Sequence, residues 1–110
     1  MHLYVKGYYP LRVRIEIVPS ARRHRITDAE IRSTIVYPQL RLAIAARRAG
    51  TQPYFYTAPT ADNRPWIEVI ADLIDPTVAV AFHAMMLRPS VVTSLGIAHL
   101  IAPEYGRQRT

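Results

Sequence analysis

Two β-rich runs joined by a three-residue turn constrain the fold of this chain more than any other feature. Residues 66–74 (WIEVIADLI) carry two acidic side chains on one face of an apolar run, and residues 78–87 (VAVAFHAMML) are apolar on both faces except at His83. The segment between them, Asp75-Pro76-Thr77, is typical of a tight turn. The two runs therefore predict a β-hairpin, and the continuous apolar run predicts a strand in the interior of a sheet.

Three earlier segments also have the composition of strands. Residues 11–18 alternate apolar and charged side chains, which is typical of a half-buried strand. Residues 40–48 combine the alternation of a strand with the alanines of a helix, and we take the strand. Gly50 then makes a turn into the aromatic-rich residues 53–57, which favour a strand. Residues 59–65 are polar and proline-flanked, as expected for a loop.

Two helices have clear end signals. Thr27 followed three residues later by Glu30 forms a capping box, so a helix is expected over residues 28–37. A second, short helix is expected over residues 90–95, ended by Gly96. The order of strand, helix, several strands and helix predicts an α+β fold: a small antiparallel sheet with helices packed on one face.

The length of 110 residues fits one domain over residues 1–110. We expect residues 1–10 to be an N-terminal extension, and residues 98–110 to be a tail that is flexible or docks on a partner. No run of residues has the length and composition of a membrane span or a signal peptide, so we expect a cytoplasmic protein with no membrane partner. The absence of cysteine excludes disulfides, thiolate zinc sites and cysteine nucleophiles.

Positive charge is concentrated in the first half of the chain. Residues 1–50 hold ten basic and three acidic residues, a net charge of +7, whereas residues 51–110 hold four basic and five acidic residues, a net charge of −1. A one-sided basic surface attracts polyanions such as RNA, DNA, anionic lipid or an acidic protein. Thirteen of the fourteen cations are arginine, which suits bidentate phosphate contacts but also follows from genome base composition.

Several of these side chains are candidates for contacting RNA. The run Arg22-Arg23-His24-Arg25 leads into the capped helix, whose N-terminus itself favours anions; the same run also fits a solvated stretch of surface charge. Aromatic rings can stack on the bases of single-stranded RNA. The candidates for RNA or phosphate binding are Arg22, Arg23, Arg25, Arg47, Arg48, Tyr54 and Tyr56.

Two short motifs carry a resemblance to a known family. Residues 21–30 (ARRHRITDAE) resemble the RKHG(I/V)-x-x-E-(E/D) segment that opens small bacterial toxins of the BrnT type, relatives in fold of the RelE-like ribonuclease toxins. Residues 83–89 (HAMMLRP) resemble the HAM-x-LRP ending of the last strand in such proteins. The chain departs from the pattern in that Arg23 stands in place of lysine, Arg25 stands in place of glycine, and residues 1–10 precede the first strand. The resemblance spans residues 20–95 and implies a RelE/BrnT-like fold in a toxin–antitoxin system.

The resemblance also implies an activity, cleavage of RNA by attack of a ribose 2′-hydroxyl on the adjacent phosphate, without a metal or other cofactor. This reaction needs a proton acceptor, a proton donor and a cation beside the phosphate. We assign His24, His83 and Arg88 as the candidate catalytic residues, because imidazole exchanges protons near neutral pH and guanidinium stabilises phosphoryl charge. The implied partners are RNA and an acidic antitoxin.

Other interpretations of the same residues stay open. His83 could be a core histidine bonded to a carbonyl, or could join Glu68 and Asp72 around a metal ion. The protein could be a non-enzymatic interaction module that uses its basic face to bind an acidic protein or to form a homodimer. A DNA-binding regulator is a further alternative, although no helix-turn-helix pair is evident.

Overall fold

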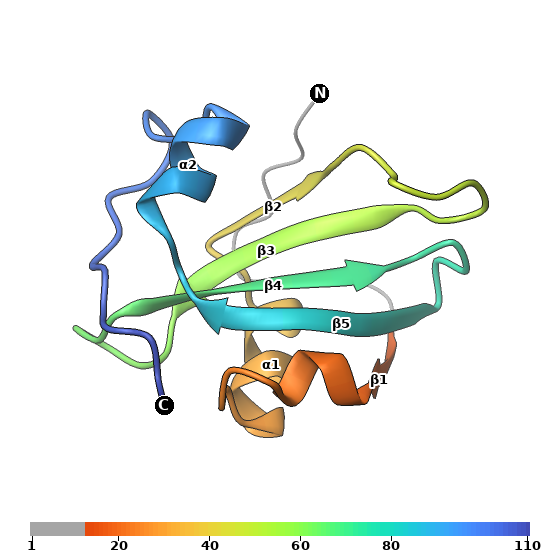
Figure 1. Cartoon of the computed structure of the whole chain (residues 1–110), viewed down its shortest axis with the longest axis horizontal. Helices are drawn as coiled ribbons and strands as arrows, with labels where there is room; N and C mark the ends of the chain where they lie inside the picture. Colours follow the sequence, from red (N-terminus) through yellow and green to blue (C-terminus); the bar gives the residue numbers. More distant parts are fainter. Residues whose placement is uncertain (1–12) are drawn as a thin grey trace.

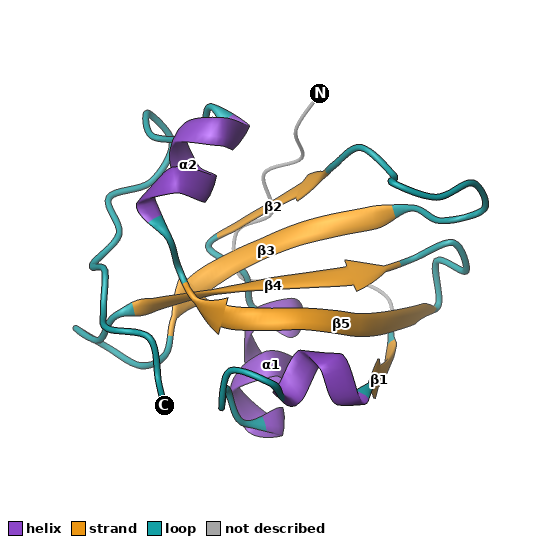
Figure 2. Cartoon of the chain, in the orientation of Figure 1, coloured by secondary structure: helices purple, strands orange, loops and turns teal. Residues whose placement is uncertain are grey.

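The computed structural model describes residues 13–110, so the predicted N-terminal extension and the first two residues of the predicted strand 11–18 lie outside the described part of the chain. These residues form five strands, two α-helices and a short 3-10 helix (Figures 1 and 2). In chain order they are β1 (Arg14–Ile17), η1 (Pro19–Arg22), α1 (Asp28–Val36), β2 (Leu40–Ala43), β3 (Pro53–Pro59), β4 (Trp66–Asp72), β5 (Val78–Met86) and α2 (Pro89–Leu95).

The strands form one sheet in the order β1-β5-β4-β3-β2. Each strand from β2 to β5 pairs antiparallel with the next, and the 66–87 hairpin is confirmed. β1 instead pairs parallel to β5, with Ile15 opposite Ala79. The sheet is therefore mixed, and the expectation of an antiparallel sheet is wrong at this edge. The reason is the connection: η1 and α1 carry the chain across one face of the sheet, from β1 at one edge to β2 at the other.

The two helices pack on opposite faces of the sheet, which corrects the prediction of helices on one face. Ile31 and Ile35 of α1 are buried against the face formed by Val69 and its neighbours. Val92 of α2 packs against Phe55, on the other face. Helix α1 covers the middle of its face, whereas α2 covers only one end of its own (Figure 1). The α+β class is confirmed, and among residues 13–110 no helix covers the other part of the α2 face.

The local signals act as predicted. The Thr27 hydroxyl accepts a hydrogen bond from the backbone of Glu30, and the Glu30 carboxylate accepts one from the backbone of Thr27. Gly96 ends α2 with φ of 67°, in the left-handed region that glycine favours. Residues 40–48 begin as the expected strand, but β2 ends at Ala43 and a long loop follows.

A β-bulge in β5 decides which face the functional side chains occupy. Ile70 lies opposite His83 and Ala71 opposite Ala81, so Phe82 is an extra residue with no partner in β4. Before the bulge the odd-numbered residues face α1, and after it the even-numbered residues do. His83 is thereby placed on the open face of the sheet instead of in the α1 core.

The C-terminal tail crosses one end of the sheet (Figure 1). The Glu104 carbonyl accepts a hydrogen bond from the backbone of Trp66, and the Gln108 side chain makes two hydrogen bonds with the backbone of Met86. Arg109 forms a two-point ion pair with Glu30 of the capping box. None of the helices in the described part combines the length and apolar composition needed to span a lipid bilayer.

Candidate functional site

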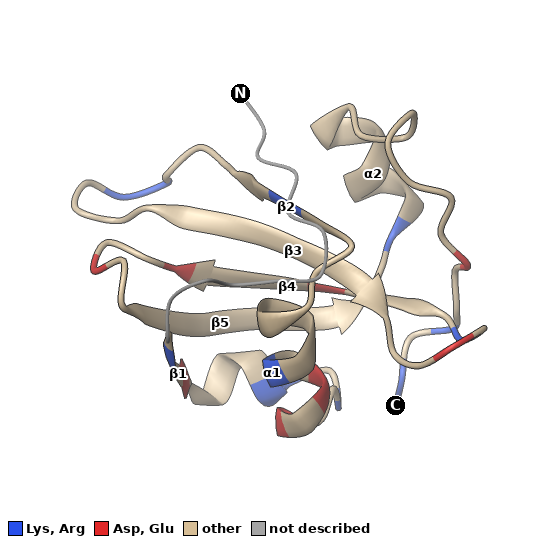
Figure 3. Cartoon of the chain, turned by 180° about the vertical axis from the view of Figure 1, so that it is seen from behind, with Lys and Arg blue, Asp and Glu red and all other residues tan. Residues whose placement is uncertain are grey.

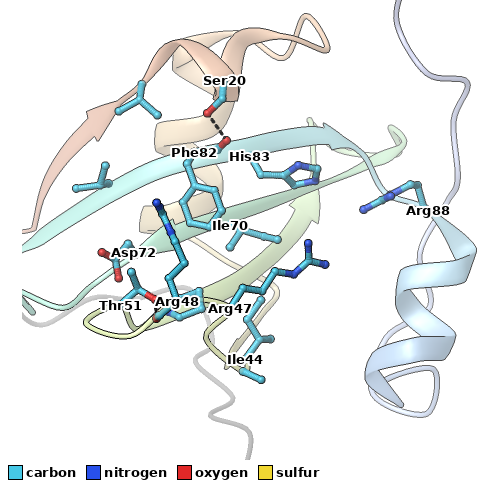
Figure 4. A pocket seen from close by; sticks show the side chains of 14 residues that line it. Ser20, Ile44, Arg47, Arg48, Thr51, Ile70, Asp72, Phe82, His83 and Arg88 are labelled. Atoms are coloured by element: carbon cyan, nitrogen blue, oxygen red, sulfur yellow. Dashed lines mark hydrogen bonds between the residues drawn. The ribbon is translucent and has the colours of Figure 1, made fainter.

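A groove of about 850 Å³ occupies the half of the sheet face that α2 leaves open. Its walls come from the β1–η1 junction, the loop between β2 and β3, the facing strands β4 and β5, and Arg88 just after β5. Figure 4 shows the side chains that line it. Segments far apart in the sequence thus meet here, because β5 and β4 are neighbours and the β2–β3 loop folds over them.

The β2–β3 loop supplies a cationic wall. Arg47 and Arg48 are exposed, and both side chains extend from the loop toward the strands (Figure 4). Thr51 donates to the Arg48 carbonyl at 2.8 Å, which holds the turn of this loop. Among residues 13–110 neither guanidinium pairs with a carboxylate. Both groups can therefore contact an anion in the groove.

The floor of the groove is apolar with one acidic group at its end. Phe82 is 39% exposed, and Ile70 and Val80 lie beside it. Ser20 donates to the Phe82 carbonyl at 2.7 Å and ties η1 to the bulge. The Asp72 Oδ1 atom accepts a short hydrogen bond, 2.6 Å, from the backbone of Gln52.

At the other end of the groove a single carboxylate organises the site. Glu68 is completely buried in β4. Its Oε2 atom lies 2.8 Å from His83 Nε2 and accepts from Arg88 Nη2 at 2.7 Å. Its Oε1 atom accepts from Arg88 Nε at 3.2 Å and from the Arg88 backbone at 3.0 Å. Burial raises the pKa of Glu68, but the hydrogen bonds from His83 and Arg88 outweigh it, so the net pKa lies below its ordinary value.

This contact defines the chemistry of His83. An ionised carboxylate can only accept hydrogen bonds, so the proton of the neutral His83 ring lies on Nε2 and the lone pair on Nδ1. The His83 side chain is 25% exposed and lines the groove. His83 is therefore neither a sealed core histidine nor a free surface one, but an oriented imidazole with one nitrogen available.

A second imidazole lies next to the first. The ring centroids of His24 and His83 are 6.3 Å apart, in an edge-to-face arrangement. Arg88 meets the same Glu68 oxygen as His83, and its side chain is 40% exposed. The structure thus brings together the three side chains singled out as catalytic candidates, His24, His83 and Arg88. His24 stands beside His83 without lining the groove itself.

The remaining cations of the first basic run do not line the groove. Arg22 forms a two-point ion pair with Asp28, which lowers the pKa of that carboxyl group. Arg23 is exposed, and Arg25 has φ of 63° with its carbonyl bonded to Arg109. Figure 3 shows Lys and Arg on several elements instead of in one patch. Within residues 13–110, the basic residues of the first half therefore do not gather on one surface.

The two tyrosines proposed to stack on bases lie on the opposite face of the sheet from the groove. Tyr56 is completely buried and Tyr54 partly so, both in the α1 core. The Arg41 guanidinium carbon lies 4.1 Å from the centre of the Tyr54 ring, a cation–π contact within the fold. The aromatic ring in the groove is Phe82 instead.

Glu68 and Asp72 were expected to have a functional role only beside His83, around a metal ion. Within residues 13–110 the structure brings no three acidic or imidazole side chains into the arrangement of a metal site. The signal for the actual role of Glu68 was a charge inside an apolar strand, because such a charge requires partners. Phe82 had no such signal, since only the bulge sets its direction.

Comparisons with known proteins add no relative: no family model, no curated protein and no solved structure matches the chain. The function is therefore argued from the groove and its side chains.

Proposed function

We propose that the groove binds single-stranded RNA and that the protein is a toxin-like endoribonuclease that cleaves this RNA without a metal. The observation that carries the proposal is the His83 imidazole at one end of a groove walled by arginines, with the centre of the His24 ring 6.3 Å from that of His83. The ion pair of Arg88 with Glu68 adds a cation at the same end.

The binding step is supported by the mixture of groups in the groove. Arg47 and Arg48 offer two guanidinium groups without a carboxylate partner in the described chain, and Phe82 offers an exposed ring. Proteins that bind single-stranded nucleic acid combine these two features, because cations follow the backbone while rings stack on bases. A duplex would not present its bases to the ring.

The cleavage step needs only groups that are present. Nδ1 of His83 takes the proton of the ribose 2′-hydroxyl as its oxygen attacks phosphorus, and the Glu68 carboxylate stabilises the imidazolium that forms. The bond from phosphorus to the 5′-oxygen breaks, and a protonated His24 gives its proton to that oxygen. The products are a 2′,3′-cyclic phosphate and a 5′-hydroxyl. The exposed part of Arg88 stabilises the phosphoryl charge.

The toxin resemblance gains one supporting detail. Arg25 stands where the toxin segment has glycine, and its φ of 63° is the conformation that glycine favours. A glycine at this position would adopt the same backbone conformation without strain.

The test is incubation of the purified protein with a labelled single-stranded RNA in the presence of EDTA. His83→Gln keeps a donor for Glu68 but removes the base, and it should lower the cleavage rate by about 100-fold or more. His24→Ala should have a similar effect. His99→Ala removes an exposed histidine away from the groove and should change nothing. Intact RNA with the wild-type protein, or equal cleavage by His83→Gln, would refute the nuclease.

A second candidate function uses the same groove. An exposed Phe82 ring beside Arg47 and Arg48 also suits an acidic protein segment with one apolar side chain, so the protein could be a non-enzymatic interaction module. This candidate predicts that RNA neither binds nor is cleaved, and that an acidic protein binds to wild type but not to Phe82→Ala.

A further inference from the structure

We infer that the end of the groove at Asp72 selects guanine, so that RNA is cut on the 3′ side of guanosine. The inference rests on the proposed function, because it names the base that the RNA groove accepts. Its starting point is an acidic group where a phosphate-binding groove should have none. Asp72 shares the groove with Arg47 and Arg48.

A carboxylate repels phosphate, so Asp72 does not bind the phosphate groups of the RNA backbone. Its Oδ1 atom accepts one hydrogen bond, from Gln52, and the structure gives Oδ2 no partner among the described residues. An ionised carboxylate can accept about four hydrogen bonds, so both oxygens have capacity left. The natural ligand of such a group is a pair of adjacent N–H donors.

Guanine has that pair of donors. Its N1–H and N2–H groups lie side by side and match the two carboxylate oxygens, whereas adenine and cytosine place an acceptor nitrogen beside their amino group and uracil places carbonyls on both sides of its N–H. Guanine also carries the O6 and N7 acceptors that arginine recognises. Arg47 and Arg48 enter the same groove as Asp72 and can supply those donors.

Phe82 and the strand register place the guanine site at a suitable distance from His83. The bulge directs the Phe82 ring into the groove, where a base can stack on it. Asp72 lies opposite Val80 and Ile70 lies opposite His83, so two strand residues, about 7 Å, separate the Asp72 position from that of His83 along the sheet. That separation is within one nucleotide. The 3′-phosphate of a guanosine held by Asp72 would therefore reach His83.

The experiment uses seven-residue RNAs of uridine with G, A or C at the central position, and measures the dissociation constant and the cleavage position for each. Wild type should bind the guanosine RNA about tenfold more tightly than the other two and cut after the guanosine. Asp72→Asn should remove this preference. Its binding to the RNAs with A or C at the central position should stay equal or tighten, which also shows that the groove is intact. Asp62→Asn, an exposed aspartate in the β3–β4 loop, is the matched control.

The outcomes separate the two proposals. If wild type binds all the RNAs equally and Arg47→Ala/Arg48→Ala loses RNA affinity, guanine selection is refuted, but RNA binding in the groove is still supported. A guanosine preference that persists in Asp72→Asn would also refute the role of Asp72. Failure of every RNA to bind would overturn the proposed function itself.

Discussion

At the scale of single residues, Glu68 links the stability of the fold to the geometry of the site. It is a fully buried charge in the strand at the centre of the sheet, and each of its oxygens accepts two hydrogen bonds. Its partners come from the end of β5 and the start of α2. One carboxylate therefore fixes the orientation of His83, the position of Arg88 and the turn between strand and helix.

Removal of this carboxylate should be costly. Glu68→Ala leaves the Arg88 backbone N–H, its guanidinium and His83 without their acceptor, so we expect a loss of about 2–3 kcal/mol in the free energy of unfolding, measured by urea denaturation. Glu16→Ala breaks only an exposed ion pair with Arg14 and should cost less than about 1 kcal/mol. Similar effects of the two changes would contradict the structural role of Glu68.

The contribution of Glu68 to the free energy of unfolding should depend on pH. Its folded pKa is lowered, so its contribution to stability is complete above the ordinary value of 4.5 and is lost as the pH falls through the folded pKa. The stability difference between wild type and Glu68→Ala should therefore shrink on acidification below pH 4.5.

Arg25 is a residue that the fold strains. Its φ of 63° lies in the left-handed region, which costs a non-glycine residue about 1–2 kcal/mol. Arg25→Gly should raise the free energy of unfolding by about 0.5–1 kcal/mol once the backbone entropy of glycine is included. This gain should appear as a higher midpoint of thermal unfolding. Arg23→Gly is the matched control, because Arg23 has φ of −61° and the same change should lower stability. A loss of stability in Arg25→Gly would contradict the claim that the left-handed backbone at Arg25 is strained.

At the scale of elements, the start of α1 and the C-terminal tail form one unit. Arg109 donates to both oxygens of Glu30 at 2.6 and 2.9 Å, and Glu30 also accepts from the backbone of Thr27. These contacts, with Arg109 the largest cause, lower the pKa of Glu30 to about 2. The last residues of the chain therefore hold the first turn of the helix.

Arg109→Ala should reveal this coupling through its pH dependence. We expect a loss of about 1–2 kcal/mol at pH 7, since the pair is partly exposed. The contribution of Glu30 is full above pH 4.5 and disappears as the pH falls toward 2, so the difference from wild type should vanish over that range. Arg107→Ala, an exposed neighbour, should have little effect at any pH. A pH-independent difference for Arg109→Ala would contradict the account.

Most elements were predictable because their signals are local. The capping box at Thr27, the turn at Asp75 and the left-handed Gly96 each lie within a few residues of the element they limit. The end of β2 at Ala43 was not predictable, because Ile44 continues the apolar alternation of Leu40 and Leu42 and its backbone N–H still donates to the Pro53 carbonyl. β3 begins at Pro53, so residues 45–48 have no strand residues opposite them. The bulge at Phe82 had no local signal either, although it decides the face on which His83 lies.

At the scale of the whole molecule, the parts that could not be predicted are the non-local ones. The parallel pairing of β1 with β5 and the placement of helices on both faces depend on the path of η1 and α1 across the sheet. The groove is assembled from segments around residues 18–20, 44–53, 70–72 and 80–88. The three catalytic candidates, Arg47 and Arg48 could be predicted as site residues from the sequence. The hydrogen bond between Glu68 and His83, which orients the imidazole, could not.

The central claim is that the groove, and not positive charge in general, binds RNA. The most direct measurement is the anisotropy of a fluorescent single-stranded RNA, titrated from 50 to 200 mM salt with three proteins. Arg47→Ala/Arg48→Ala should weaken binding and reduce the slope of log K against log salt by about 1.4, since each cation lost removes about 0.7 on a single strand. Arg64→Ala/Arg107→Ala removes two exposed arginines outside the groove and should leave both values unchanged. Equal weakening by the two double variants would contradict the claim.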